Sequence, residues 1–125
     1  LDDRIAAPPM YAPTVASVVF DNAAPKTNDL LTATVVGAYD ADGDAMEFRY
    51  VWYVNQEIVR DVTKAARTDT LDLSEPGHGD KGDAIHVSVT PMDAELTGQA
   101  VSSTTVTVVN SAPVARTELV SIRAY

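Results

Sequence analysis

Three aspartates within five residues, in the segment Asp40-Ala-Asp-Gly-Asp44, are the side chains best suited to chemistry. Their carboxylates are the hard oxygen ligands that Ca²⁺ prefers, and a glycine lets the chain turn sharply between them. Ca²⁺ takes about 6–8 oxygens, so one short segment cannot complete a site. We expect the loop after the sixth strand to reach the same end of the fold and to add a fourth carboxylate. The predicted metal ligands are Asp40, Asp42, Asp44 and Asp93.

Further acidic residues are predicted near that end of the fold: Glu95, and the pair Asp2 and Asp3 at the entry of the chain. The pattern is not that of an EF-hand, because no Glu stands at the twelfth position and no flanking helices are expected. The alternative interpretation is an ordinary turn, in which aspartates accept hydrogen bonds from their own backbone and need no metal.

Aromatic side chains suggest a second function, sugar binding, because exposed rings can stack on sugars. Tyr53 is predicted to face outward, and Tyr11 and Tyr39 are expected to be exposed near the acidic end. The other rings of the same strand share one face, and we expect that face to be the core rather than a sugar platform. These predicted core rings are Phe48, Tyr50 and Trp52.

Covalent or acid–base catalysis has little support in the sequence. The chain has no cysteine and two histidines, His78 in a glycine-rich turn and His86 on an outward strand face. No serine lies in a nucleophile-elbow sequence, and no pair of histidines has zinc-ligand spacing. We therefore predict that the protein is not an enzyme.

Composition excludes several other classes. The 125 residues carry a net charge of −9, which disfavours binding to nucleic acid or to an anionic membrane surface. No apolar run approaches the roughly 18 residues that a membrane span needs, so we expect no membrane insertion. With 46% hydrophobic residues, the chain is globular, and its length suits one domain.

The elements that must position these side chains are strands. Apolar and polar residues alternate along short runs, which are separated by clusters of Asp, Asn and Gly, and this is typical of half-buried antiparallel strands. At most one helical turn is expected, over 61–68. Two sheets must hide their apolar faces against each other, so we predict an all-β antiparallel sandwich of about seven strands. The predicted runs are 15–20, 30–38, 46–54, 58–59, 70–73, 84–90 and 101–109.

Six short motifs resemble those of bacterial immunoglobulin-like repeat domains, which are close to the PKD and cadherin-like modules of surface and secreted proteins. The resemblance covers roughly residues 12–111, and its most specific part is the acidic loop before a Tyr-x-Trp strand. The motifs lie at 12–15, 27–33, 40–44, 50–55, 81–83 and 87–93.

This resemblance implies an immunoglobulin-like (Ig-like) antiparallel β-sandwich that serves as a non-catalytic structural or adhesive spacer in a multidomain extracellular or cell-surface bacterial protein. Ca²⁺ at the predicted aspartate site would stiffen it. Its partners would be neighbouring domains of the same chain, or a glycan or protein ligand. The alternative is a carbohydrate-binding accessory domain attached to an extracellular enzyme.

Three segments are predicted along the chain. Residues 1–13 are an extended lead-in or linker, 14–110 form the sandwich, and 111–125 are a linker or the start of a following repeat. An Ala-Pro pair at 12–13 recurs at 112–113, which suggests tandem repeats of about one sandwich in length.

Overall fold

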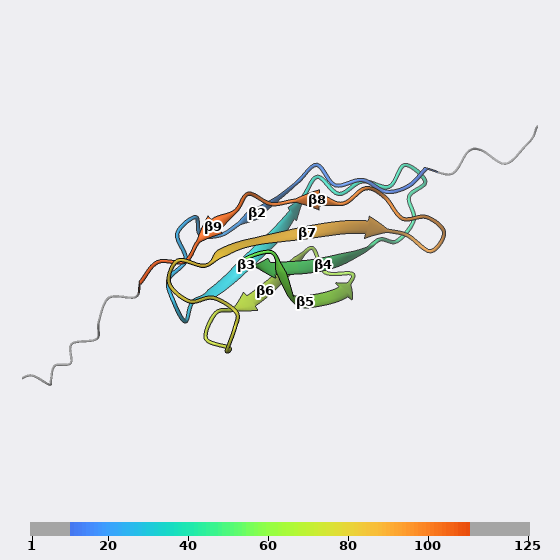
Figure 1. Cartoon of the computed structure of the whole chain (residues 1–125). Coiled ribbons are helices and arrows are strands. Elements are labelled where there is room, and N and C mark those ends of the chain that lie inside the picture. Colours follow the sequence, from blue (N-terminus) through green and yellow to red (C-terminus); the bar gives the residue numbers. More distant parts are fainter. Residues whose placement is uncertain (1–10, 111–125) are drawn as a thin grey trace, which may run out of the picture.

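The computed structural model describes residues 11–110, whose strands form two antiparallel sheets packed face to face (Figure 1). No helix occurs within this range, so the predicted all-β immunoglobulin-like sandwich is confirmed. The strands in chain order are β2 (Ser17–Phe20), β3 (Leu30–Val36), β4 (Glu47–Val54), β5 (Glu57–Lys64), β6 (Thr68–Asp72), β7 (Ala84–Met92), β8 (Val101–Ser102) and β9 (Val106–Thr107).

The smaller sheet has the order β2-β3-β6, and the larger has the order β5-β4-β7-β8, with β9 also pairing with β7. Every strand pair within these sheets is antiparallel. The longest ladder joins β4 and β7, from Glu47 opposite Met92 to Val54 opposite Ile85. This ladder runs along the long axis of the molecule, and loops extend from both of its ends (Figure 1).

The core follows from the two-residue alternation in the strands, because successive side chains point to opposite faces. The predicted aromatic core residues are all fully buried, and Trp52 stacks on Phe20 of the facing sheet with 5.7 Å between ring centroids. The inward-facing side chains that fill the space around Trp52 are Val18, Leu31, Ala33, Val35, Phe48, Tyr50, Val54, Leu71, Ile85, Val87 and Val89.

The chain between 57 and 64 differs from the prediction. The helical turn allowed over 61–68 is wrong, because β5 pairs with β4 as far as Lys64 and β6 begins at Thr68. The alternation along β5 is weak since the strand lies at a sheet edge, and the register shifts between Trp52 and Tyr53 of β4. Pairing with a buried neighbour therefore decides the conformation more than the local pattern does.

The last predicted strand, 101–109, is split into the short strands β8 and β9. At the break, the backbone N–H of Val87 donates to the Ser103 side-chain oxygen at 3.0 Å. The Ser103 hydroxyl thus takes the place of a backbone acceptor in the ladder, which is how serine often interrupts regular structure.

Three segments meet at one end of the sandwich, which we call the entry end: residues 11–16, the β3–β4 loop (37–46) and the β7–β8 loop (93–100). Thr14 and Tyr39 exchange two backbone hydrogen bonds of 2.8 Å. A Cβ atom at Gly98 would collide with the Pro13 carbonyl oxygen, so only glycine permits this close approach. The end is therefore built from long-range backbone contacts (right of Figure 1).

Candidate metal centre

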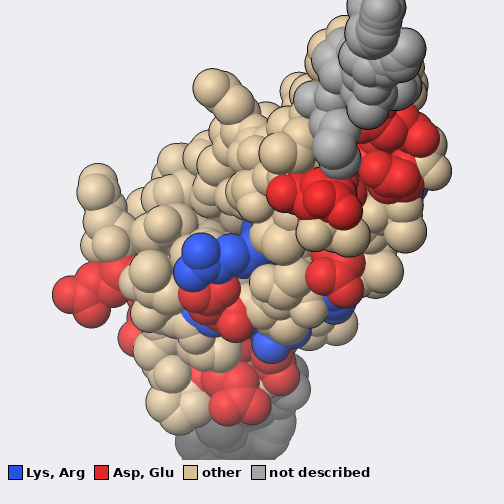
Figure 2. Space-filling view, turned by 90° about the vertical axis from the view of Figure 1, so that its right-hand side faces the viewer, with Lys and Arg blue, Asp and Glu red and all other residues tan. Residues whose placement is uncertain are grey.

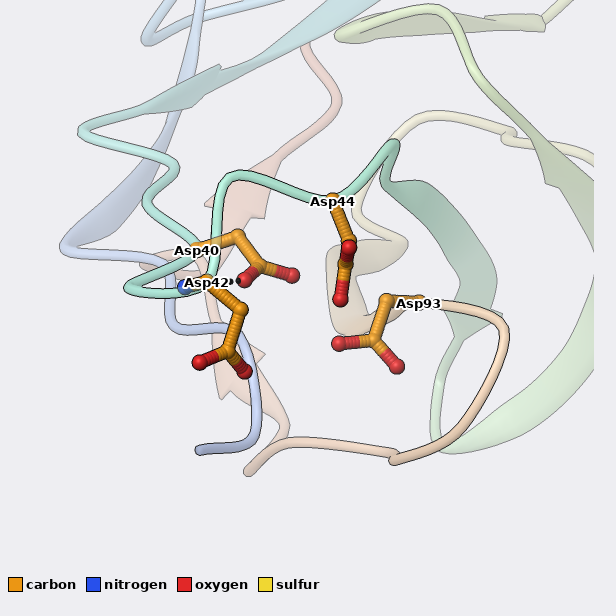
Figure 3. Close-up of side chains that lie close together, drawn as sticks. All are labelled: Asp40, Asp42, Asp44 and Asp93. Carbon is orange, nitrogen blue, oxygen red and sulfur yellow. Dashed lines mark hydrogen bonds between the residues drawn. The ribbon is translucent and has the colours of Figure 1, made fainter. Parts of the chain in front are cut away.

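The four predicted metal ligands lie together at the entry end. Asp40, Asp42 and Asp44 come from the β3–β4 loop and Asp93 from the β7–β8 loop, and each offers a carboxylate oxygen within 4.8 Å of the others. Figure 3 shows the two loops bringing these side chains toward one another. We call this group the aspartate cluster. Its members are the four carboxylates that the sequence predicted would meet.

The backbone explains why the two loops hold their aspartates in place. One Asp40 oxygen accepts a hydrogen bond from the Asp42 N–H at 2.8 Å, and Gly43 has a φ of 75°. One Asp93 oxygen accepts from the N–H groups of Glu95 and Leu96, at 2.7 and 2.6 Å. Both are turns in which an aspartate bonds its own backbone, as the alternative interpretation expected.

Each of these two carboxylates uses only one oxygen for its turn. The second oxygens, Asp40 Oδ2 and Asp93 Oδ2, are buried, and no N–H or O–H group in the described part of the chain donates to them. A buried carboxylate oxygen without a partner costs free energy, so such atoms are rare and need an explanation. The turn interpretation and the metal interpretation therefore apply to different oxygens of the same side chains.

Like charges dominate the aspartate cluster. Within residues 11–110, none of its carboxylates forms an ion pair with Lys or Arg. Partial loss of hydration and the neighbouring charges of Asp40 and Asp93 raise the pKa of Asp44. Hydrogen bonds from the backbone of Leu96 and Glu95, together with a side-chain hydrogen bond between Asp93 and Asp40, lower the pKa of Asp93. Figure 2 looks onto this end and shows acidic side chains gathered there.

Other groups predicted near the aspartate cluster have mixed outcomes. Glu95 is close enough to contribute to the raised pKa of Asp44, but it is not one of the four converging carboxylates. Asp2 and Asp3 lie outside the described residues, as do most of the predicted lead-in and all of 111–125. The backbone N–H of Tyr11 donates to Asp42 at 3.1 Å, which joins the entry of the chain to the cluster.

The side chains considered for sugar binding divide clearly. Tyr11 and Tyr39 are 54% and 63% exposed at the entry end, as predicted. Tyr53 also faces outward as predicted, but it stacks on His86 with 4.5 Å between ring centroids, so the two rings cover each other.

The other histidine, His78, lies in the turn after β6. Its Nδ1 atom is 3.0 Å from the backbone carbonyl oxygen of Asp72. A carbonyl oxygen only accepts hydrogen bonds, so Nδ1 is the donor.

A second acidic site was not predicted from the sequence. Asp69 of β6 has a fully buried side chain, which accepts hydrogen bonds from Arg60 through both oxygens at 2.8 Å. It also accepts from Trp52 Nε1 at 2.8 Å and pairs with Lys64 at 2.7 Å. The signal is present in the sequence, since Asp69 has the same inward parity as Leu71, but the predicted strand begins only at residue 70.

Two hollows flank the entry end. The larger, about 460 Å³, is lined by uncharged residues of 12–15 and 97–101. The smaller, about 380 Å³, adjoins the aspartate cluster through Asp93 and is otherwise lined by Ala45, Met46, Glu47, Ala65 and Ala94. Neither contains a nucleophile paired with a base, whereas the second places an apolar surface beside the cluster.

Comparison with known proteins supports the fold alone. No protein-family model and no curated protein matches the sequence. The structure is similar to the extracellular region of rat CD45, domains d3–d4, with a TM-score of 0.52 and 9% sequence identity. The match covers 75% of this chain and 51% of that one, so this chain corresponds to about half of the known structure. Within residues 11–110, no helix is long and apolar enough to cross a lipid bilayer.

Proposed function

We propose that this chain is a non-catalytic, immunoglobulin-like module of a multidomain extracellular bacterial protein, and that Ca²⁺ bound by the aspartate cluster stiffens its entry end. The observation that carries the proposal is the pair of buried, unpartnered oxygens on Asp40 and Asp93 among four converging carboxylates in the described range. A cation would give both oxygens a partner at once, and carboxylate-only ligands suit a hard one.

The spacing of the oxygens is compatible with Ca²⁺, and their origin on two loops favours it over Mg²⁺. Ligands on opposite sides of a Ca²⁺ ion lie about 4.6–5.2 Å apart, because each bond is about 2.3–2.6 Å long. The corresponding separation for Mg²⁺ is about 4.2 Å, and Mg²⁺ also demands near-octahedral geometry. The oxygens of the aspartate cluster all lie within 4.8 Å of one another and come from two loops, which suits the more tolerant geometry of Ca²⁺.

Binding at this place would act on an end of the fold that is made of loops. The cation would join the β3–β4 loop to the β7–β8 loop, and through the Tyr11–Asp42 hydrogen bond it would also hold the entry of the chain. A spacer needs such stiffness where a neighbouring domain of the same chain attaches. The acidic surface would keep repeated modules soluble and apart.

Calorimetric titration of the full chain with CaCl₂ tests the proposal. We expect saturable heat for the natural chain, weaker heat with MgCl₂, and none for Asp44→Asn. Asp80→Asn is the matched control, since Asp80 is an exposed aspartate outside the aspartate cluster, and it should bind as the natural chain does. Absence of heat for the natural chain at millimolar CaCl₂ would refute the cation.

The second candidate function is a carbohydrate-binding accessory domain. It is favoured by Tyr11 and Tyr39, which are both more than half exposed, and by the hollow that adjoins the aspartate cluster. Sugar hydroxyl oxygens are neutral metal ligands, and they could complete the coordination of a cation that already has four carboxylate ligands. Affinity electrophoresis in soluble polysaccharides, with and without CaCl₂, tests it. Tyr39→Ala should abolish any retardation, whereas Tyr53→Ala should not.

A further inference from the structure

The aspartate cluster includes a pair of residues with a backbone chemistry of its own, Asp42-Gly43. Asp42 is the one aspartate in the sequence that is followed by glycine, and no asparagine is followed by glycine. The backbone nitrogen after an aspartate can attack the aspartate carboxyl carbon, because the two atoms close a five-membered ring. A bulky following residue, such as Val62 after Asp61, shields that nitrogen, whereas glycine has no side chain to do so.

The local structure leaves this pair accessible. Asp42 and Gly43 are both exposed in the β3–β4 loop. A Cβ atom placed on Gly43 would meet no atom within 4 Å outside the adjoining residues, so other segments do not crowd this part of the loop. The Tyr11 N–H donates to Asp42 Oδ2 at 3.1 Å, and such a donor stabilises the negative charge that develops on a carboxyl oxygen under attack.

Two features of the folded loop oppose the attack. The Gly43 N–H donates to the backbone carbonyl oxygen of Asp40 at 3.0 Å, which closes the turn. The Asp42 carboxylate lies in the aspartate cluster, with an oxygen within 4.8 Å of the other carboxylates. Attack needs the carboxyl carbon of Asp42 against the Gly43 nitrogen, so the loop must first open locally. A cation that holds Asp42 in the cluster would therefore slow the reaction.

We infer that Asp42 is a site of spontaneous isomerisation to isoaspartate, through the backbone nitrogen of Gly43, and that this change disables the aspartate cluster. The Gly43 nitrogen bonds to Asp42 Cγ, and its proton leaves with the carboxyl OH as water, which yields a cyclic succinimide. Water then cleaves the bond between that nitrogen and the backbone carbonyl carbon of Asp42, where a new carboxylate forms. One water leaves and one water adds, so the mass of the chain is unchanged.

Isomerisation alters the geometry that holds the cluster together. The backbone then passes through Cβ and Cγ of Asp42, which lengthens it by one carbon–carbon bond of about 1.5 Å. The new carboxylate is attached directly to Cα and is one methylene shorter than the old one. Both the cluster and the Tyr11 N–H therefore lose the Asp42 carboxylate. The consequence for Ca²⁺ rests on the proposed function, whereas the isomerisation itself needs no metal.

Incubation of the full chain at neutral pH in EDTA, in water enriched in the heavy isotope of oxygen, tests the inference. Each cycle of succinimide formation and hydrolysis takes up one labelled oxygen, so peptide mapping should find the label and isoaspartate at Asp42. Asp80 is the internal control, because it is an exposed aspartate followed by lysine, and it should stay unlabelled over the same period.

Gly43→Asn is the matched variant. Asparagine tolerates the left-handed backbone that Gly43 has at a φ of 75°, so the variant should keep the melting temperature of the natural chain. Its side chain shields the nitrogen, so the labelling of Asp42 should fall to that of Asp80. Labelling of Asp42 as fast as in the natural chain would overturn the inference.

Ca²⁺ gives a second measurement. If only the empty site reacts, a hundredfold excess of free Ca²⁺ over its dissociation constant should slow labelling about a hundredfold, because about 1% of the sites are then empty. In calorimetry, the incubated chain should lose its heat with CaCl₂ in proportion to its isoaspartate content.

Absence of label at Asp42 in EDTA overturns the inference, and so does equal labelling of Asp80. Full retention of the calorimetric heat by a chain that contains isoaspartate at Asp42 also overturns it. Absence of heat for the fresh chain refutes the proposed cation instead, because the labelling in EDTA still decides whether Asp42 isomerises.

Discussion

Asp69 and the aspartate cluster are acidic sites of opposite kinds within one sandwich. The Asp69 carboxylate is buried between the sheets and is surrounded by donors from Arg60, Lys64 and Trp52. The aspartate cluster has four carboxylates, two buried oxygens without partners, and no positive side chain paired with it in the described residues. The protein itself supplies the positive charges at Asp69, whereas under our proposal Ca²⁺ would supply them at the cluster.

The pKa shifts at the two sites have opposite signs. Burial alone would raise the pKa of Asp69, but hydrogen bonds from Arg60, Lys64 and Trp52 outweigh it and lower the pKa to about 2. At the cluster, partial loss of hydration and like charges raise the pKa of Asp44. At neutral pH the charged form of Asp69 therefore stabilises the fold, whereas the charged form of Asp44 destabilises it.

The largest effect is expected from Asp69→Ala. It leaves buried Trp52 Nε1 without an acceptor and removes the counter-charge of Arg60 and Lys64. Breaking a buried ion pair costs about 3–5 kcal/mol, and we expect about 3, because Arg60 and Lys64 are 38% and 35% exposed and can turn toward water. Urea unfolding at neutral pH without Ca²⁺ measures the loss. A loss below about 1 kcal/mol would show that the ion pairs of Asp69 stabilise the fold no more than an exposed ion pair does.

Stability between pH 4 and 2 should fall by about 2 kcal/mol through Asp69, because its pKa in the folded state is about 2 and an unfolded aspartate titrates near 3.9. The unfolded chain binds the proton first, so this stabilisation is present above pH 4 and is lost as the pH falls. Asp44 acts with the opposite sign, because its raised pKa means that the folded chain binds the proton first. Asp61, Asp72 and Asp93 also have lowered pKa values and act in the same direction as Asp69, so urea unfolding without Ca²⁺ should show a net loss of stability from pH 4 to 2. Stability that stays constant over this range would contradict the lowered pKa of Asp69.

Asp44→Asn sharpens the comparison with a smaller effect. Without Ca²⁺ it should raise the melting temperature slightly, because it removes one of four like charges, and it should abolish the response to Ca²⁺. Asp80→Asn should do neither. A lower melting temperature for Asp44→Asn without Ca²⁺ would mean that Asp44 already has a stabilising partner.

The smallest effect is expected from Arg49→Ala. Arg49 pairs with Asp61 through two hydrogen bonds of 2.9 and 2.7 Å, but both side chains are exposed, and water screens such pairs. Urea midpoints for Arg49→Ala and the natural chain should nearly coincide. A loss comparable with that of Asp69→Ala would show that burial is not what separates the two ion pairs.

The cluster could be predicted from the sequence because Asp40, Asp42 and Asp44 are close in the chain, and because the topology of a sandwich brings the loop of Asp93 to the same end. The core could be predicted because apolar and polar residues alternate along the strands around Trp52, and the apolar side of each strand is the buried one. Asp69 was missed for a physical reason: its burial depends on Arg60 and Lys64, which lie on β5, and that strand has only weak alternation. The choice between a turn and a metal site could not be made from the sequence, because Asp40 and Asp93 each use one oxygen in a turn and leave the other free of turn hydrogen bonds.

The most direct test of the central claim is urea unfolding of the full chain with CaCl₂ against the same chain in EDTA, with NaCl added to equal ionic strength. At a hundredfold excess of free Ca²⁺ over its dissociation constant, the free energy of unfolding should rise by about 2.7 kcal/mol. The NaCl control matters because screening alone relieves part of the repulsion among the four carboxylates. Coincident unfolding curves in millimolar Ca²⁺ and in EDTA would contradict the claim that the aspartate cluster holds a cation.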